Sequence, residues 1–376
     1  MTSTRPRPGA APRTDGLDGL DGVGAAGAFD GALREFFAAR RAEAAAISPA
    51  YTATVAELES YVLRGGKRIR PTFARLGWLG AGGNGEGPSA WAVLRTCAAL
   101  ELLHASALIH DDVIDAAPTR RGAAAAHVMF ADHHRARCWS GEADLFGTGA
   151  AILIGDLAQA WADDMIRTSG LPATAQERIA PIWSALRTEV LCGQLLDLTA
   201  EASAAEDIDT PLLVNHYKTA SYTVERPLHI GAAIAGADSE LIAAYRAFGL
   251  DIGIAFQLRD DLLGVFGTPQ ETGKPSGGDL IQGKRTVLFA LALRHADDRD
   301  PDAAKFLRTK IGTDITADEL DTMRAIITDV GAVAHVERDI TARTERALAA
   351  LETSRTGAEA KDQLRALAIS ATQRTS

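Results

Sequence analysis

Residues 108–122 read LIHDDVIDAAPTRRG, an apolar helical pattern that carries three aspartates and ends in two arginines. Residues four apart lie on one face of a helix, so Asp111 and Asp115 project side by side while Asp112 is offset by one position. Burying carboxylates on an apolar helix is costly unless something cationic compensates them. The segment therefore predicts a helix whose end binds a cation.

A second aspartate pair, Asp260 and Asp261, stands far along the chain in FQLRDDLLG, residues 256–264. Basic residues follow both pairs: Arg120, Arg121, Lys274 and Lys284. Carboxylate oxygens favour Mg²⁺, which commonly bridges a few carboxylates and the phosphates of a substrate. Either pair alone is typical of a solvated helix end. Both pairs with their basic residues predict a Mg²⁺–diphosphate site inside a helical bundle.

The composition favours an all-α fold. Of 376 residues, 47% are hydrophobic, with Ala and Leu dominant, and only 6% are aromatic, which suits helices better than sheets. A chain of this length can bury a large core, as one helical domain or two smaller ones. The net charge of −10, from 39 basic and 49 acidic residues, argues against a nucleic-acid partner.

The cysteines and the apolar runs bear on the cellular compartment. Cys97, Cys138 and Cys192 are odd in number and fit neither a disulfide framework nor a zinc spacing, which is typical of a reducing cytoplasm. The chain has no continuous apolar run of about 18 residues, so we expect no transmembrane segment. The basic N-terminus is not followed by an apolar stretch, which argues against secretion. We therefore expect a cytoplasmic protein.

A change in composition along the chain separates an N-terminal tail from a helical domain. Residues 1–28 are rich in Pro, Gly, Asp and Ala and include DGLDGLDG, so we expect a disordered tail. Residues 29–376 read as one all-α domain. Gly and Pro break the helical pattern at several places: 80–88, 116–122, 141–149, 169–172, 206–211 and 267–283. The last break directly follows the second aspartate pair and reads as a lid.

A basic, glycine-containing string, GGKRIRP, occupies residues 65–71. Glycines let the backbone approach an anion, and arginine binds phosphate oxygens in a bidentate manner. Alone, this string is as typical of a solvated basic turn as of a phosphate site. The TRRG string that follows the first aspartates adds two arginines, which could serve one phosphorylated substrate each.

Taken together, the motifs resemble the trans-prenyltransferases of the polyprenyl synthetase family, which join isoprenyl diphosphates head to tail. The resemblance runs from about residue 29 to the C-terminal region and follows these strings: GGKRIRP, HDDVID with RRG, Gly155–Asp156, EVLCGQLLD (189–197), YKTASYT (217–223), FQLRDD and GKRT (283–286). It implies a single large helical bundle of the isoprenoid synthase type with a central active-site cavity. It also implies a homodimer.

The resemblance assigns metal ligands to individual positions. It makes Asp111 and Asp115 ligands of two Mg²⁺ ions and Asp260 the ligand of another, so about three ions are expected with substrate bound. One position departs from the pattern, because Gly264 stands where a second DDxxD motif would place its last aspartate. We expect Asp261 and water to cover the gap, or Asp279 in the lid to approach it.

The resemblance also assigns residues to the two diphosphates and to the reacting carbons. It places the allylic diphosphate against Arg120, Lys218 and Lys274, and it adds Lys284 of the GKRT string to the substrate-binding residues. It places isopentenyl diphosphate against Lys67, Arg70, His104 and Arg121. The side chains expected to face the developing allylic cation, where lone pairs and dipoles stabilise positive charge, are Lys218, Thr219, Tyr222 and Gln257.

Small residues near the first aspartates predict a long product. Ala107 lies four residues before Asp111, about 5.4 Å deeper on the same helix face, and Ser106 precedes it. In the family, bulky aromatics at these positions stop synthesis at fifteen carbons. With two small residues here, Leu103 becomes the candidate floor, and we expect a product of at least twenty carbons. Geranylgeranyl diphosphate is our choice.

Three other functions stay open. A longer polyprenyl product would require a deeper floor. A class I terpene synthase would ionise one diphosphate and cyclise it, but the low aromatic content argues against this activity because aromatic walls steer cyclising cations. A non-catalytic partner subunit would be expected to lose metal ligands, and only Gly264 points that way.

Overall fold

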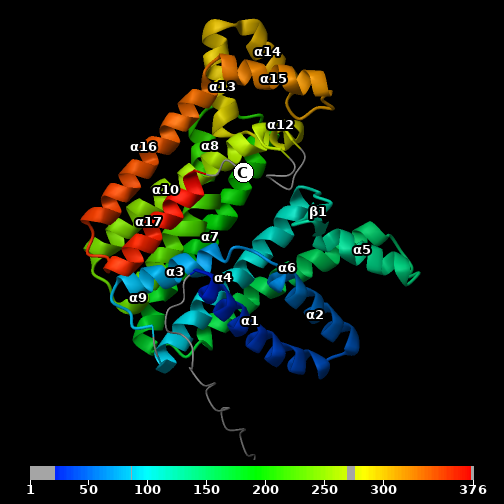
Figure 1. The fold of residues 1–376 in the computed structure, drawn as a ribbon. Helices are drawn as coiled ribbons and strands as arrows, with labels where there is room; N and C mark the ends of the chain where they lie inside the picture. The colour runs from blue at the N-terminus through cyan, green and yellow to red at the C-terminus, as the bar shows by residue number, and fades with distance from the viewer. Residues whose placement is uncertain (1–21, 86, 269–275, 374–376) are drawn as a thin grey trace, which may run out of the picture.

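The computed structural model describes residues 22–85, 87–268 and 276–373, and these residues form an almost entirely helical molecule (Figure 1). The first half contains α1 (Gly22–Ala45), α2 (Pro49–Leu63), α3 (Ile69–Gly80), α4 (Gly87–Ile114), α5 (Ala126–Ala136), α6 (Ala143–Arg167) and α7 (Ala173–Ala202). The second half contains α8 (Asp209–Val214), the π-helix η1 (Asn215–Glu225), α9 (Arg226–Ala235), α10 (Ser239–Phe266), α12 (Gly278–Gln282), α13 (Val287–Arg299), α14 (Pro301–Lys310), α15 (Ala317–Asp329), α16 (Ala332–Thr353) and α17 (Ala358–Thr372). The all-α prediction is confirmed.

Among the described residues, the only strands are β1 (Thr119–Arg120) and β2 (Ala123–Ala124), which pair antiparallel. This small hairpin follows α4 directly. Arg121 and Gly122 at its tip both have positive φ, 52° and 73°, which makes the tight reversal possible. The hairpin therefore turns the two arginines back toward the end of α4.

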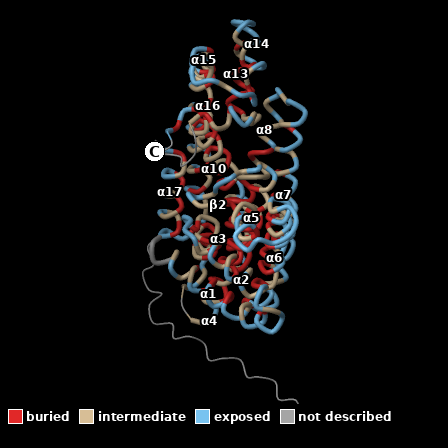
Figure 2. Tube along the Cα trace, turned by 90° about the vertical axis from the view of Figure 1, so that its right-hand side faces the viewer, coloured by how far each residue is buried: buried red, intermediate tan, exposed pale blue. Residues whose placement is uncertain are grey.

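Long helices in the middle of the molecule carry the core. α4 packs along α6, and α10 packs along both η1 and α16. Buried residues follow the inner faces of these helices, while pale exposed residues cover the outside (Figure 2). The largest apolar cluster joins α1, α4 and α6, and a second one joins α10 to α13–α16. The two aspartate-bearing helices thus belong to the best-buried part of the fold.

Helix starts follow ordinary capping chemistry. Asp238 caps α10 by accepting from the backbone N–H of Leu241, and Thr286 caps α13 in the same way. α15 begins with a full capping box, in which Thr316 and Glu319 each satisfy a backbone N–H of the other. These caps fix where α10 and α13 begin, and α10 carries the second aspartate pair.

The N-terminal boundary differs from the expectation. α1 begins at Gly22, whereas we expected the ordered domain to begin at Phe29. The segment GVGAAGA holds as many glycines as alanines, so its helix propensity is poor, but Phe29 and Leu33 of the same helix are fully buried. Burial of those side chains anchors the helix, which extends toward the N-terminus. Residues 1–21, the rest of the expected tail, lie outside the described residues.

The segment expected to be an irregular lid, residues 267–283, contains the short helix α12. Residues 269–275 of that segment lie outside the described residues. The helix starts after Gly277 and ends before Gly283, and both glycines have positive φ. The described part of the expected lid is therefore structured at Gly278–Gln282.

Three helices are long and apolar enough to cross a membrane by length and composition: Ser89–Ile114, Ala143–Arg167 and Ser239–Phe266. The most apolar window of each is 78%, 39% and 50% buried inside the fold, in that order. Searching for continuous apolar runs overlooked these helices because occasional polar residues interrupt them. The bundle itself covers much of their apolar surface.

Candidate active site

The last turn of α4 and the residue after it carry three carboxylates, and the hairpin arginine pairs with two of them. Arg120 donates from Nε to Oδ1 of Asp112 (2.7 Å) and from Nη2 to Oδ2 of Asp111 (2.9 Å). Asp112 is fully buried, and burial raises its pKa although Arg120 opposes this effect. Asp111 and Asp115 are only partly buried. Asp112 therefore holds Arg120 in place, while the other two carboxylates remain reachable.

Lys218 links α4 to α7. Its Nζ donates to Oδ2 of Asp197 (2.6 Å) and to Oδ1 of Asp111 (3.4 Å). Burial alone would raise the pKa of Asp111, but the charges of Lys218, Arg120 and Lys284 outweigh it and hold that pKa below its ordinary value. Burial alone would lower the pKa of Lys218, but Asp197 and Asp111 raise it. Both groups are therefore charged at neutral pH.

Lys284, just after α12, lies on the other side of the same centre. Its Nζ is 2.7 Å from Oε1 of Glu201 and 3.5 Å from Oδ2 of Asp115. Burial would lower the pKa of this lysine, but Asp197, Glu201 and Asp115 raise it. The two lysines and the carboxylates of α4 and α7 thus surround one charged centre.

Sequence reasoning overlooked two members of this centre. It quoted Asp197 as the end of EVLCGQLLD but gave it no role, and it did not consider Glu201 at all. Both lie on α7, four residues apart and therefore on one helix face. That spacing, the same as between Asp111 and Asp115, is the signal that could have found them.

α10 contributes the second aspartate pair and a glutamine. Thr219 donates from Oγ1 to Oε1 of Gln257 (2.7 Å), whose Nε2 donates to Oδ1 of Asp261 (2.9 Å). Asp261 is 3% exposed, and its Oδ2 has no hydrogen-bond partner among the described residues. Burial, with Asp279, Asp260 and Asp197 nearby, raises its pKa well above the ordinary value, against the effect of Gln257. This end of α10 is thus rich in closely spaced acids.

Asp279 occupies the space beside Gly264. A Cβ atom built on Gly264 would lie 2.0 Å from Oδ2 and 2.4 Å from Cγ of Asp279. No real Cβ tolerates such a contact, so Gly264 has to be a glycine as long as Asp279 keeps this position. The carboxylate of α12 therefore lies where a side chain of residue 264 would begin.

Residues of GGKRIRP meet η1 across the molecule. Arg70 donates from Nη2 to Oγ1 of Thr223 (3.0 Å), and its guanidinium lies 4.2 Å from the ring centre of Tyr222, a cation–π contact. The Tyr222 hydroxyl lies 3.1 Å from Nδ1 of His104. Burial raises the pKa of Tyr222 to about 12, so its hydroxyl stays protonated.

Arg121 connects the hairpin to the glycine turn. Its Nη1 donates to the carbonyl of Gly65 (3.0 Å), and its Nη2 lies 3.4 Å from Nε2 of His104. Burial and the neighbouring arginines hold the pKa of His104 well below its ordinary value, so the ring is neutral. Lys67 is exposed at the same turn. Three basic residues and a neutral histidine therefore gather on one side of η1: Lys67, Arg70, Arg121 and His104.

Arg68 of GGKRIRP has a structural role instead. It is 3% exposed, with a left-handed backbone (φ 48°). It donates from Nε to Oδ1 of Asp30 (2.9 Å) and from Nη1 to Oε2 of Glu101 (2.6 Å). Its charge is thus neutralised by α1 and α4, and it ties the glycine turn to both helices.

Glycines let η1 approach α7 and α10 closely. A Cβ on Gly193 of α7 would lie 2.4 Å from the backbone N of Lys218, and one on Gly253 of α10 would lie 2.3 Å from Cα of Ala220. π-helices are rare and often occur at functional sites. The close packing sets the position of the Lys218 backbone relative to both neighbouring helices.

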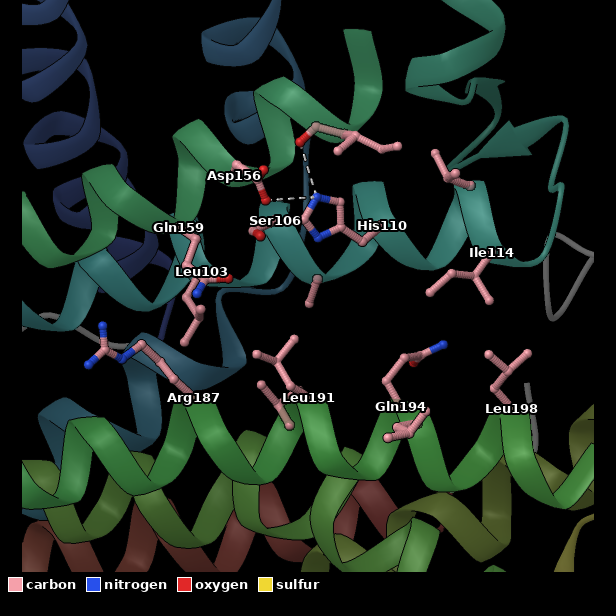
Figure 3. A pocket seen from close by; sticks show the side chains of 15 residues that line it. Leu103, Ser106, His110, Ile114, Asp156, Gln159, Arg187, Leu191, Gln194 and Leu198 are labelled. Atoms are coloured by element: carbon pink, nitrogen blue, oxygen red, sulfur yellow. Dashed lines mark hydrogen bonds and ion pairs between the residues drawn. The ribbon is translucent and has the colours of Figure 1, made fainter. Parts of the chain in front are cut away.

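A cavity of about 440 Å³ runs between α4, α6 and α7 (Figure 3). Most side chains around it are apolar, and Ser106, Ala107 and Leu103 of α4 all line it. His110 reaches across to α6, where its Nε2 lies 3.6 Å from Oδ1 of Asp156. Gly155 leaves the room for this ring, because a Cβ there would lie 2.2 Å from Nε2 of His110.

The donor set fits Mg²⁺ that is shared with a phosphate ligand. No group of three His, Cys, Asp or Glu side chains among the described residues forms a ready-made metal cage. Mg²⁺ does not need one, because it keeps several waters and takes one or two carboxylates together with substrate phosphates. Asp112 and Asp261 each bury one carboxylate oxygen that has no hydrogen-bond partner in the described part of the chain. Those two oxygens are buried, so the oxygens that can reach a hard cation are the ones of the partly exposed Asp111 and Asp115.

The structure brings the expected site residues together, with one exception. Lys274, expected at the allylic diphosphate, lies outside the described residues. The remaining expected residues lie at the charged centre, in the basic group beside η1, at the end of α10 or along the cavity, and their contacts do not reveal which substrate each one binds. Those roles remain predictions.

Comparisons with known proteins agree with this arrangement. The sequence profile of the family described as Polyprenyl synthetase matches residues 52–327. The geranylfarnesyl diphosphate synthase of Aeropyrum pernix is 34% identical over 286 residues, which cover 75% of this chain and 82% of that protein. The geranylgeranyl diphosphate synthase of Mycobacterium tuberculosis is 32% identical over 259 residues, 68% of this chain and 67% of that protein.

Solved structures give the same picture. The crystal structure of geranylgeranyl pyrophosphate synthase from Corynebacterium glutamicum, complexed with isoprenyl diphosphate and magnesium, superposes with a TM-score of 0.90. Its sequence is 46% identical, and the match covers 94% of this chain and 100% of that one. The resemblance that the sequence motifs indicated is thereby confirmed.

Proposed function

This chain belongs to the polyprenyl synthetase family, and we propose that it joins isopentenyl diphosphate head to tail to an allylic diphosphate in a Mg²⁺-dependent reaction. One observation carries the proposal. A mostly apolar cavity of about 440 Å³ lies beside a centre that holds both carboxylates and lysines. A prenyl tail fits the first part, and a diphosphate with its metal ions fits the second.

Asp111 and Asp115 would hold two Mg²⁺ ions, and Asp260 would hold another. Bound there, the ions would neutralise the allylic diphosphate and make it a better leaving group. Lys218 and Lys284 now pair with carboxylates and could turn to the diphosphate oxygens. Arg120 would do the same from its anchor on Asp112. This exchange of partners would supply positive charge where the diphosphate departs.

Asp279 would take over the task of the acid that Gly264 lacks. Its carboxylate lies next to the backbone of residue 264 and close enough to Asp261 to raise the pKa of that group. A carboxylate at this place could bind the α10 metal ion directly or through water. This supports a working second aspartate motif and argues against a non-catalytic partner subunit.

Isopentenyl diphosphate would bind beside η1, at the basic group described above. Lys67, Arg70 and Arg121 offer three positive charges there, and neutral His104 can donate or accept a hydrogen bond. The double bond of isopentenyl diphosphate would attack the allylic carbon after the diphosphate leaves, and a proton would then be lost to the departing diphosphate. The oxygens of Thr219, Tyr222 and Gln257, together with the Lys218 backbone, could stabilise the cation away from water.

The product should contain at least twenty carbons, and geranylgeranyl diphosphate is the proposed one. Ser106 and Ala107, both small, line the cavity. The curated relatives named above make products of twenty or more carbons according to their names. Both observations favour a long tail.

We also propose a homodimer that functions in the cytoplasm. Several apolar side chains that line the cavity are exposed on the isolated chain: Ile152, Leu191, Leu195 and Leu198. Leu145 and Leu153 of α6 are 73% and 69% exposed. Apolar patches of this kind mark association surfaces, and a second copy over them would close the open side of the cavity.

Incorporation of labelled isopentenyl diphosphate tests the function. The purified protein, with Mg²⁺ and separate allylic primers of five, ten and fifteen carbons, should transfer label into an acid-labile prenyl product. Asp111→Asn should lower the rate by roughly a hundredfold or more. Removing one charged group at such a site raises the activation free energy by several kcal/mol. Diphosphate release without incorporation would instead indicate a terpene synthase. Neither incorporation nor release would indicate a partner-dependent subunit.

A further inference from the structure

The cavity ends on a charged side chain. Figure 3 shows the cavity running from Ile114 and Leu198 at one end to Leu103, Gln159 and Arg187 at the other. Along both α4 and α7 this distance spans eleven residues, or about 16 Å. The Arg187 guanidinium lies beyond the Leu103 side chain in this view. Leu103 and Arg187 therefore both line this end of the cavity, and the guanidinium lies further out than Leu103 in this view.

Arg187 is held in one orientation by two neighbours. Its Nη1 pairs with Oδ2 of Asp163 on α6, and its guanidinium lies 5.7 Å from the ring centre of Trp183. Trp183 in turn donates from Nε1 to Oδ1 of Asp163 (2.6 Å). Asp163 thus fixes both the arginine and the tryptophan, and the charged group cannot simply swing away from the end of the cavity.

The guanidinium also has hydrogen-bonding capacity left over. Its Nε is buried and has no hydrogen-bond partner among the described residues. Arg187 as a whole is only partly buried, with 27% of its side chain exposed, so water can still reach the charged group. Gln159 adds a polar amide at the same end. This end of the mostly apolar cavity is therefore polar and accessible to water. Four further residues add polar groups along its length: Ser106, His110, Asp156 and Gln194.

A growing prenyl tail would meet this polar end last. Each added isoprene unit gains free energy by burial against apolar side chains. A unit that displaces water from a charged guanidinium gains nothing equivalent, because the charge loses hydration and an alkene cannot replace those hydrogen bonds. Elongation would stop where this exchange becomes unfavourable.

We propose that Arg187 sets the product length through its charge, with Asp163 and Trp183 as positioning residues. The proposal rests on the proposed function, because it concerns the tail of the product that the enzyme would make. It replaces Leu103 as the floor of the cavity. Elongation could stop at a polar group (a polar stop) or at a group that blocks the space (a steric stop). These two cases predict different product lengths for substitutions of similar size.

Two substitutions distinguish these stops. Arg187→Met keeps a long unbranched side chain but removes the charge, so the share of label in products longer than the main wild-type product should rise roughly tenfold. Arg187→Lys is shorter but keeps the charge, so it should leave the product length at the wild-type value. Asp163 is 38% exposed and stays hydrated without its partner, which limits the risk of misfolding.

Product length is measured by separating the dephosphorylated, labelled alcohols formed with a fifteen-carbon primer. Arg167→Met is the matched control, because Arg167 of α6 is 73% exposed and does not line the cavity. Isothermal titration with prenyl diphosphates of fifteen, twenty and twenty-five carbons adds a readout that needs no turnover. Arg187→Met should bind the longest of these at least about tenfold more tightly than the wild type does.

The outcomes are separable. Longer products from Arg187→Met but not from Arg187→Lys support the polar stop. Equal lengthening by both variants would make Arg187 a steric plug and overturn the proposal, as would unchanged products from Arg187→Met. Absence of any elongation by the wild-type enzyme would refute the proposed function, and the binding series would then still test the polar end of the cavity.

Discussion

Asp279 and Gly264 form a complementary pair at the scale of single residues. The carboxylate of one fills the space that a side chain on the other would need. The sequence motif alone shows only that position 264 lacks an aspartate. Asp279 follows Gly264 by fifteen residues, but it places a carboxylate beside that position because α12 folds back onto the end of α10.

Replacing Asp279 with Asn should weaken binding of Mn²⁺ in the presence of inorganic pyrophosphate. Loss of one carboxylate ligand should lower the affinity by roughly tenfold. Isothermal titration measures the affinity without any turnover. Asp314→Asn, an exposed acid after α14, is the control and should leave the affinity unchanged.

The double variant Gly264→Asp with Asp279→Gly provides the rescue. It moves the carboxylate from α12 back to α10 and removes the collision that Gly264→Asp alone would cause. Metal affinity should recover at least in part. Unchanged Mn²⁺ affinity in Asp279→Asn would mean that the carboxylate does not serve the metal site.

Ala107→Phe should shorten the product. Ala107 lines the cavity one helical turn from Asp111, so an aromatic ring there would block the path toward Leu103. Chromatography of the labelled alcohols should show fifteen-carbon material in place of longer chains. If Ala107→Phe still made the wild-type product, the tail would have to run elsewhere, and the assignment of this cavity would be wrong.

The π-helix η1 is one element that the sequence did not predict. The string YKTASYT pointed to Lys218, Thr219 and Tyr222, which η1 carries, but nothing in it distinguishes a π-helix from an α-helix. The sequence also hides the packing of η1, which approaches two other helices closely at Gly193 and Gly253. Such long-range contacts cannot be inferred from local spacing.

Gly193→Ala should therefore affect stability and activity together. The new methyl group would lie 2.4 Å from the Lys218 backbone and force η1 away from α7. We expect a loss of about 2 kcal/mol in the free energy of unfolding, typical of overpacking, and a lower rate of incorporation. Urea unfolding followed by circular dichroism measures the first effect.

Gly31→Ala in α1 is the matched control for that experiment. A Cβ there meets no described atom within 4 Å, so the same change should be neutral or stabilise the helix by up to about 1 kcal/mol. Equal stability of Gly193→Ala and the wild type would show that η1 can move without cost. The tight packing would then not position Lys218.

At the scale of the whole molecule, the sequence predicted the fold class and the family, since helical spacing and motif order carry that information, while the roles of the site residues stay predictions. The first aspartate motif illustrates this, because residues 111 and 115 share a face in any helix. Arg68 and Arg70 are a different case, because the resemblance gave Arg70 a substrate role and gave Arg68 none. Only the fold shows that Asp30 and Glu101 neutralise one of them while the other faces Tyr222.

The exposed apolar residues of α6 should hold two copies together. The native protein should sediment at twice the chain mass of 39.6 kDa. Leu153→Glu places a charge at a side chain that is 69% exposed in the isolated chain and should weaken the dimer by at least about tenfold. Sedimentation equilibrium measures this effect.

Ile47→Glu is the control for dimer formation, because Ile47 lies in the turn between α1 and α2 and is 71% exposed. It should leave the mass unchanged. A wild-type protein that sediments as a monomer at micromolar concentration would contradict the proposed homodimer. The cavity would then have to function with its open side facing water.

The most direct test of the account is the carbon number of the product that the wild-type protein makes from isopentenyl diphosphate, Mg²⁺ and a fifteen-carbon allylic primer. Mass spectrometry of the dephosphorylated alcohol gives this number. The account predicts a chain of twenty or more carbons, formed only when Mg²⁺ is present. Recovery of the unextended fifteen-carbon primer, with no label incorporated, would contradict it.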